Sequence, residues 1–383
     1  MSTSLPPEVM VEIVSRLPPK YLLRFRCVSK TWLAVIDGNH YLFSKNLLNQ
    51  SILNTQNTTY PLPLILVKAT DKSNSEESVF YSLSYDTLDC LSQIPMKFPP
   101  ENLPLGRVHL FIRPHFASSN GLLCLYDFET TRVYIWNPAT PSVGLKALPP
   151  LSPHPFHYEI DLRPFSVGFG FCRKSGDFKV VSLRHVANDN GYGMAKQIAE
   201  VYSSSSGCWG LLNLRVPCAV FAHPQTLALD GVFLWLAEQD DGVIISFDFT
   251  KDVFRTTPLP YSRDLLSFSH QLMGLNGYVA VAVFPHADTN IKMSLEIWVL
   301  LEIGVKESWR RFISIEPPMD LERPLGFWKN GELFMLNREG QLVLYDPFTQ
   351  TKNHLQIKWL KDSFQVVVLY TQTSVELGGE YNL

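Results

Sequence analysis

The sequence predicts a mainly β protein, in which a small N-terminal α-helical module precedes a β-propeller of about six four-stranded blades. Two observations predict this fold. Four places repeat one plan of short apolar runs around an Asn-Gly or Asp-Gly pair, which tolerates the positive φ angles of a tight hairpin. Residues 5–43 differ, because their apolar side chains recur at helical intervals.

The composition agrees with this fold and argues against several classes of function. Aromatic residues make up 12% of the 383 residues and prolines number 27, which is typical of a β-rich body with many turns. A net charge of −3 does not indicate a nucleic-acid-binding protein, which would carry an excess of basic residues. The six cysteines form no CxxC pair, the prolines come too early for a signal peptide, and no apolar run reaches membrane-spanning length. We therefore expect free thiols, no membrane contact, and a cytoplasmic or nuclear protein.

Helix signals open the chain. Ser4 can cap a helix whose first turn holds Pro6 and Pro7, where no backbone N–H is needed. Apolar residues follow at helical spacing up to Leu17, and the next two prolines end that helix. A second apolar run covers residues 22–36. These pieces are too short to form a core alone, so they either pack as a helical hairpin on the rest of the chain or bury their spare apolar surface on a partner.

Charge favours a partner for this module. Residues 1–45 hold six basic and three acidic side chains and so carry +3, whereas the rest of the chain carries −6. A basic and apolar module suits an acidic partner and speeds its docking. An ordinary solvated helix face is the alternative interpretation of the same charges.

The four repeated units are predicted to be antiparallel four-stranded meanders. Two further segments fit the plan less cleanly, and the one at residues 64–96 lacks its first strand. The run at 364–370 can supply that strand and remove two open edges. An open sandwich or two smaller β domains is the alternative fold. The predicted strands are 116–119, 122–127, 132–137 and 143–148; 226–229, 232–237, 243–248 and 253–259; 271–275, 278–284, 295–300 and 309–315; 325–329, 332–336, 342–346 and 354–359; 165–171, 178–184, 197–202 and 208–214; and 64–68, 78–85 and 91–96.

The N-terminal stretch resembles an F-box. The matching text is Leu5-Pro6 with Glu8, the block from Ile13 to Pro18, the basic and apolar residues 20–26, Val28-Ser29-Lys30, and Trp32. The resemblance implies a three-helix unit that binds a Skp-type adaptor, which in turn binds a cullin–RING ubiquitin ligase. The residues that it implies for adaptor binding are Leu5, Pro6, Glu8, Ile13, Leu17, Pro18, Leu22, Leu23, Arg26, Val28, Lys30 and Trp32.

The β region is similar to the F-box-associated domain of plant F-box proteins, a kelch-like group that includes defence-related and self-incompatibility (S-locus) members. The similarity rests on several motifs in order: 120–124 with 136–140, 167–171, 179–181, 200–202, 245–249, and 297–299 with 307–309. The kelch double glycine is mostly missing, since Gly378-Gly379 lies outside the repeats. The two resemblances together imply an F-box at 1–45, a linker at 46–60 and a substrate-recognition domain at 61–377.

The sequence contains no strong motif for catalysis or metal binding. His154 and His157 lie in a proline-rich loop without a further Cys/His cluster, so a metal site is not expected. The GxSxG, P-loop and HExxH motifs are absent from the sequence, and Gly168 and Gly170 do not have dinucleotide spacing. We expect no catalytic residue and no cofactor. The resemblances imply a non-catalytic substrate receptor for protein ubiquitination and degradation, with an unidentified protein target. The alternatives are a propeller-fold enzyme with a helical appendage and a Skp-binding adaptor outside any ligase.

Overall fold

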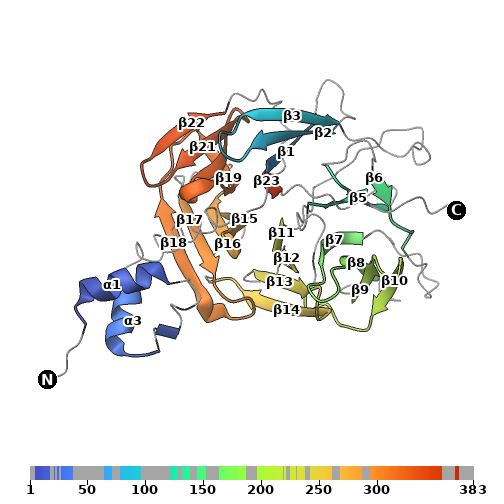
Figure 1. The fold of residues 1–383 in the computed structure, drawn as a ribbon, viewed down its shortest axis with the longest axis horizontal. Coiled ribbons are helices and arrows are strands. Elements are labelled where there is room, and N and C mark those ends of the chain that lie inside the picture. The colour runs from blue at the N-terminus through green and yellow to red at the C-terminus, as the bar shows by residue number, and fades with distance from the viewer. Residues whose placement is uncertain are drawn as a thin grey trace. The chain divides into compact units, whose positions relative to one another are not determined.

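The computed structural model describes residues 5–17, 21, 24–25, 27–37, 64–70, 78–95, 121–127, 132–138, 145–151, 164–186, 196–218, 220, 225–229, 231–237, 242–260, 268–286, 294–355 and 367–370. The chain forms two compact units. Unit 1 comprises Met1–Tyr60, Thr257–Arg338 and Leu342–Leu355; unit 2 comprises Pro61–Thr256, Glu339–Gln341 and Gln356–Leu383. Figure 1 labels their helices and strands. Within the described part of the chain, no helix is long and apolar enough to cross a membrane.

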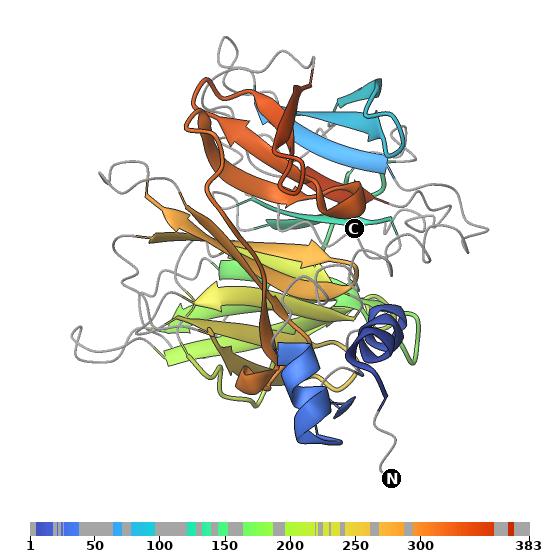
Figure 2. The same ribbon diagram turned by 90° about the vertical axis from the view of Figure 1, so that its left-hand side faces the viewer.

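Two helices, drawn in blue in Figures 1 and 2, belong to unit 1: α1 (Pro7–Arg16) and α3 (Lys30–Asp37). The N-cap of α1 is Pro6, which makes no side-chain cap hydrogen bond, and the predicted capping residue Ser4 lies outside the described residues. A turn at Cys27 and Val28 interrupts the second apolar run. The reason is Ser29, whose Oγ accepts the Trp32 backbone N–H at 3.3 Å and so begins a new helix.

Unit 1 also holds two four-stranded antiparallel sheets. In each sheet the strands lie in chain order, which is the meander predicted from the repeats. The strands of the first are β15 (Phe268–Leu275), β16 (Tyr278–Pro285), β17 (Leu295–Leu300) and β18 (Trp309–Ile315), with the short helix η2 (Lys306–Ser308) before β18. Those of the second are β19 (Leu321–Phe327), β20 (Leu333–Asn337), β21 (Leu342–Asp346) and β22 (Thr351–His354), with η3 (Lys329–Gly331) before β20.

Four sheets make up unit 2, apart from the last residues of β14. They consist of β23 (Val367–Tyr370), β1 (Leu64–Thr70), β2 (Ser78–Ser84) and β3 (Cys90–Pro95); β4 (Leu123–Asp127), β5 (Arg132–Trp136) and β6 (Leu145–Ala147); β7 (Pro164–Phe171), β8 (Phe178–Val186), β9 (Lys196–Ser203) and β10 (Cys208–Leu212); and β11 (Gln225–Leu229), β12 (Val232–Ala237), β13 (Val243–Asp248) and β14 (Val253–Pro258).

The C-terminal strand completes the first sheet. β23 pairs antiparallel with β1, with Leu64 opposite Tyr370 and Val67 opposite Val367. The sheet order is therefore β23-β1-β2-β3. This pairing confirms that the last β run supplies the strand that the segment at residues 64–96 lacks.

Two of the four predicted hairpin turns have two residues, as expected. Asn276 and Gly277 have φ angles of 51° and 81°, and Leu275 lies opposite Tyr278. At the second turn, Leu229 lies opposite Val232. The turn at Asn330-Gly331 is different, because these residues form part of η3 and the Trp328 N–H bonds to the Glu332 carbonyl at 2.7 Å, which closes a longer loop. The strand predicted at 116–119 lies outside the described residues.

One predicted strand is misplaced. The apolar residues at 354–359 suggested a strand, but β22 covers Thr351–His354 and its four side chains are all exposed. Its backbone pairs with β21, so that Asp346 lies opposite Thr351. Main-chain pairing and the Lys352 Nζ–Asp320 Oδ2 contact at 2.6 Å hold this polar edge strand. No apolar residue marks it, and apolar patterning therefore does not reveal it.

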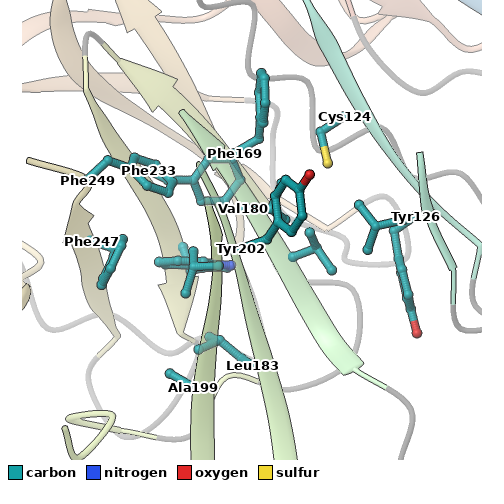
Figure 3. Close-up of a cluster of buried hydrophobic side chains, with 14 of the residues drawn as sticks. Cys124, Tyr126, Phe169, Val180, Leu183, Ala199, Tyr202, Phe233, Phe247 and Phe249 are labelled. Atoms are coloured by element: carbon teal, nitrogen blue, oxygen red, sulfur yellow. The ribbon is translucent and has the colours of Figure 1, made fainter. Parts of the chain in front are cut away.

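The core of unit 2 is built from aromatic side chains of neighbouring sheets. Figure 3 shows Phe169, Phe233, Phe247 and Phe249 gathered in it, and each of these four is fully buried. The rings of Phe247 and Phe249 meet edge to face with centroids 5.1 Å apart. Phe247 on β13 and Phe249 just after it share one buried cluster with Phe169 of β7, and this cluster joins the β7–β10 sheet to the β11–β14 sheet.

Thiol reactivity can test this packing. Cys124 is 2% exposed, and burial raises the pKa of its thiol, whereas Cys208 lies exposed on β10. Because the thiolate is the reactive form, we expect iodoacetamide to label Cys208 in the native protein and Cys124 only after unfolding. Peptide mass spectrometry over time measures both rates. Equal labelling of the two cysteines in urea is the control, and equal labelling without urea would contradict the fold.

Candidate functional site

The helical module of unit 1 exposes apolar side chains. Leu5 is 49% exposed, Val9 43%, Val28 64% and Leu33 38%. Isolated exposed leucines are common on protein surfaces, but here four large apolar side chains lie on one small module. We call these four residues the exposed apolar set. Its members offer apolar area that the described part of this chain does not cover.

Other apolar side chains of the same module are buried. Met10 is 3% exposed, Val14 1% and Ile36 8%. Met10 and Val14 are four residues apart and so lie on one face of α1. Val14 and Ile36 belong to the same buried cluster as the cores of the β15–β18 and β19–β22 sheets. The module therefore divides its apolar residues between an internal face and the exposed apolar set.

Trp32 contributes mainly to this internal packing. Its ring meets the ring of Phe25 edge to face, with centroids 5.1 Å apart, and both side chains pack partly buried against the cluster that holds Val14 and Ile36. A tryptophan held in this way can present only part of its surface to another protein.

Cations accompany the exposed apolar set. Lys30 and Arg24 are both exposed, and the Arg24 guanidinium lies over the Tyr21 ring at 5.6 Å from its centroid. Glu12 is exposed on α1. The described part of the module thus presents basic groups beside apolar ones, as the charge of residues 1–45 predicts.

The structure places the predicted adaptor-binding residues in three groups. Leu5, Pro6, Val28 and Lys30 are exposed. Ile13, Leu17 and Trp32 are partly buried, and Glu8 lies on α1. Pro18, Leu22, Leu23 and Arg26 lie outside the described residues. Two exposed apolar residues, Val9 and Leu33, were not in the predicted set. The helical position of Val9, directly before the buried Met10, could have indicated it.

The Asp residues at two strand ends serve turns. Asp248 Oδ1 accepts the backbone N–H of Thr250 at 2.9 Å and of Lys251 at 3.1 Å. Asp346 Oδ1 accepts the N–H of Phe348 at 2.8 Å. These are Asx turns, which fix the chain direction after a strand. His154 and His157 lie outside the described residues. Among the described residues, no group of three His, Cys, Asp or Glu side chains could hold a metal ion.

Three tryptophans of the β region are core residues. Trp136, Trp235 and Trp309 are 1%, 0% and 4% exposed. The Trp235 indole N–H donates to Ser166 Oγ at 2.7 Å, and that of Trp309 to the Pro258 carbonyl at 2.9 Å. The indole N–H groups of Trp235 and Trp309 thus both have a partner, which a large polar-tipped ring requires. Trp359 lies outside the described residues.

Comparison with protein families finds two matches. The F-box domain model matches residues 2–44, and the F-box associated beta propeller domain model matches residues 74–373. The first match spans the helical module and the second spans most of the strands.

Comparison with individual proteins finds plant relatives. The F-box/kelch-repeat protein At3g23880 of Arabidopsis thaliana is 25% identical over 348 residues, which cover 90% of this chain and 88% of the relative. F-box protein At3g07870 of the same plant is 24% identical over 414 residues, covering 95% and 90%. Among solved structures, Kuenenia stuttgartiensis hydrazine synthase aligns with a TM-score of 0.45 at 7% identity, over 85% of this chain and 49% of that one. A likeness of that size carries no inference about function.

Proposed function

Because this chain belongs to the family of F-box proteins with an F-box associated beta propeller domain, we propose that it is the substrate-recognition subunit of a Skp–cullin–F-box ubiquitin ligase. The F-box, at residues 1–45, docks on a Skp-type adaptor. The β domain, at residues 61–377 after a linker, holds a protein target. The chain itself performs no covalent chemistry and works in the cytoplasm or nucleus.

One observation supports the docking step above the others: the exposed apolar set on the F-box. An interface needs apolar side chains that are available in the free protein and that lose their contact with water on binding. Leu5 and Val28 meet this requirement, being 49% and 64% exposed. Lys30, two residues after Val28, is exposed and adds a cation that can steer an acidic adaptor.

The β domain supports the role of a target holder. Five of its described sheets have four antiparallel strands and one has three, and the C-terminal strand completes the first sheet. We propose that these six sheets close into a propeller ring. A rigid ring with a tethered target raises the local concentration of the target's lysines near the ubiquitin-loaded enzyme, which is catalysis by proximity.

Adaptor binding tests the docking step. In a pull-down of the full chain with a purified Skp-type adaptor, we expect Val28→Asp and Leu5→Asp to reduce adaptor retention at least about tenfold each. Both side chains are exposed, so the substitutions leave the fold intact, while a buried unpaired carboxylate in an interface costs more than 1.4 kcal/mol.

Leu91→Asp is the matched control, because Leu91 is also exposed, at 57%, but lies on β3. Retention of the adaptor by this variant, together with its loss in the other two, supports the assignment. If all three variants bind like the unmodified chain, the F-box does not use the exposed apolar set. Adding a cullin to the retained complex then separates a ligase subunit from an adaptor outside any ligase.

A further inference from the structure

In the described sheets, one edge is formed by β3, β6, β10, β14, β18 or β22, and most of these edges carry a feature that hinders pairing with another chain. The β3 edge has a bulge in its pairing and ends in Pro95. β6 has three residues, one of them Lys146. The other three protected edges carry exposed cations: Arg255 on β14, Arg311 on β18 and Lys352 on β22.

The β10 edge is the exception. β10 (Cys208–Leu212) contains no charge and no proline, and its register with β9 runs without a shift from Cys208 to Leu212. Among the described strands, β9 is its sole partner, which leaves one row of main-chain donors and acceptors open to an extended segment. Leu211 on this strand is 56% exposed, and Leu214 just beyond it is 41% exposed.

Gly210, at the centre of β10, has no internal reason to be glycine. It is not among the residues with a positive φ, and a Cβ there would meet nothing closer than the Val201 carbonyl oxygen at 3.9 Å. Glycine inside a regular strand often marks the close approach of another backbone. Here the space beside it is open to a backbone from outside.

The sequence of β10 is also complementary to itself when two copies pair antiparallel. If two copies pair antiparallel with Gly210 opposite Gly210, Trp209 of each copy lies opposite Leu211 of the other. Aromatic–aliphatic pairs of this kind are favourable across strands, and residues 206–214 hold no charge that could oppose itself. The Trp209 ring is already held in place, since its indole N–H donates to the Pro149 carbonyl at 2.9 Å.

We propose that a second copy of this chain pairs with β10 about a two-fold axis at Gly210, which joins two four-stranded sheets into one of eight strands. The interface is isologous: both copies contribute the same strand about one two-fold axis, so pairing at β10 stops at a dimer. β10 belongs to unit 2, whereas the F-box helices belong to unit 1.

Analytical ultracentrifugation of the full-length chain over a wide concentration series tests the proposal. We expect twice the mass of one chain at the upper concentrations. Leu211→Lys places a cation on the edge, as on β14, β18 and β22, and we expect it to weaken self-association more than tenfold. Leu91→Lys is the matched control, because Leu91 is equally exposed on β3, and we expect it to stay dimeric.

A disulfide tests the register. In a Cys208→Ser background, Gly210→Cys should cross-link two chains on mild oxidation, because residues opposite each other at the axis have the separation that a disulfide needs. Asn213→Cys lies opposite position 207 and should not. A chain of single mass at every concentration, a Leu211→Lys variant that still dimerises, or cross-linking at 213 in place of 210 would each overturn the proposal. A single mass with intact adaptor binding would leave the proposed function standing and point to a different protein at this edge.

Discussion

Gly170→Ala is expected to lower the melting temperature by roughly 5–10 °C, because the added methyl group has no room. A Cβ at Gly170 would lie 2.4 Å from Cδ2 and Cε2 of the Phe249 ring. That ring is fully buried beside Phe247 and cannot swing out of the way. Overpacking of this kind costs about 1–3 kcal/mol, and each kcal/mol shifts the melting temperature of a domain of this size by about 2–4 °C.

Gly168→Ala should behave in the same way, since its Cβ would lie 2.7 Å from the Phe233 ring and 2.8 Å from that of Trp235. Gly210→Ala is the control from the same sheet, because the nearest atom would be 3.9 Å away, and we expect a change below about 1 kcal/mol. Thermal unfolding followed by tryptophan fluorescence measures all three. Equal melting of Gly170→Ala and the unmodified chain would mean that the β7–β10 and β11–β14 sheets do not pack as described.

Glu200→Ala should destabilise unit 2 by about 3–5 kcal/mol, the usual result of removing one partner from a buried ion pair. The Arg184 guanidinium on β8 contacts the Glu200 carboxylate on β9, and their side chains are 4% and 5% exposed. Burial already lowers the pKa of Arg184. Glu200 supplies the carboxylate that this buried charge faces, and removing it takes away that compensation for the cost of desolvating the charge.

The double variant Arg184→Met/Glu200→Leu separates the charge from the packing. Apolar side chains of similar volume remove both charges, so we expect this variant to unfold within about 1 kcal/mol of the unmodified chain, or to be more stable. Urea unfolding of Arg184→Met, Glu200→Leu and the double variant gives the coupling free energy. If the double variant loses as much stability as the sum of the single ones, the two side chains do not act as a pair.

The features that sequence predicted well are local. The turn at Asn276-Gly277 follows from the positive φ angles that these two residue types tolerate, and the strands on either side follow from their apolar runs. Segments without a clear apolar pattern could not be predicted in this way. The exposed strand β22 has no apolar residue to mark it, and the break before α3 depends on a single hydrogen bond to Ser29.

The features that sequence could not predict depend on register. Arg184 and Glu200 are brought together because Arg184 lies opposite Ile198 while Glu200 lies opposite Ser182, and no local pattern fixes that pairing. Gly168 and Gly170 were visible as a pair of glycines in a strand, but the rings that demand them come from β12 and from Phe249, just after β13. At the F-box, periodicity indicated an apolar module, whereas the division between buried Val14 and exposed Val28 required the structure.

The pairing of β23 with β1 also affects how the protein is made on the ribosome. Strands β1, β2 and β3 leave the exit tunnel early, but their sheet gains its fourth strand only when Val367–Tyr370 has been translated. During that interval the Leu64–Val67 edge of β1 lacks its pairing strand β23, and a strand of another nascent chain can pair with it instead. Chaperone protection of this early segment would thus matter most while the middle of the chain is still being synthesised.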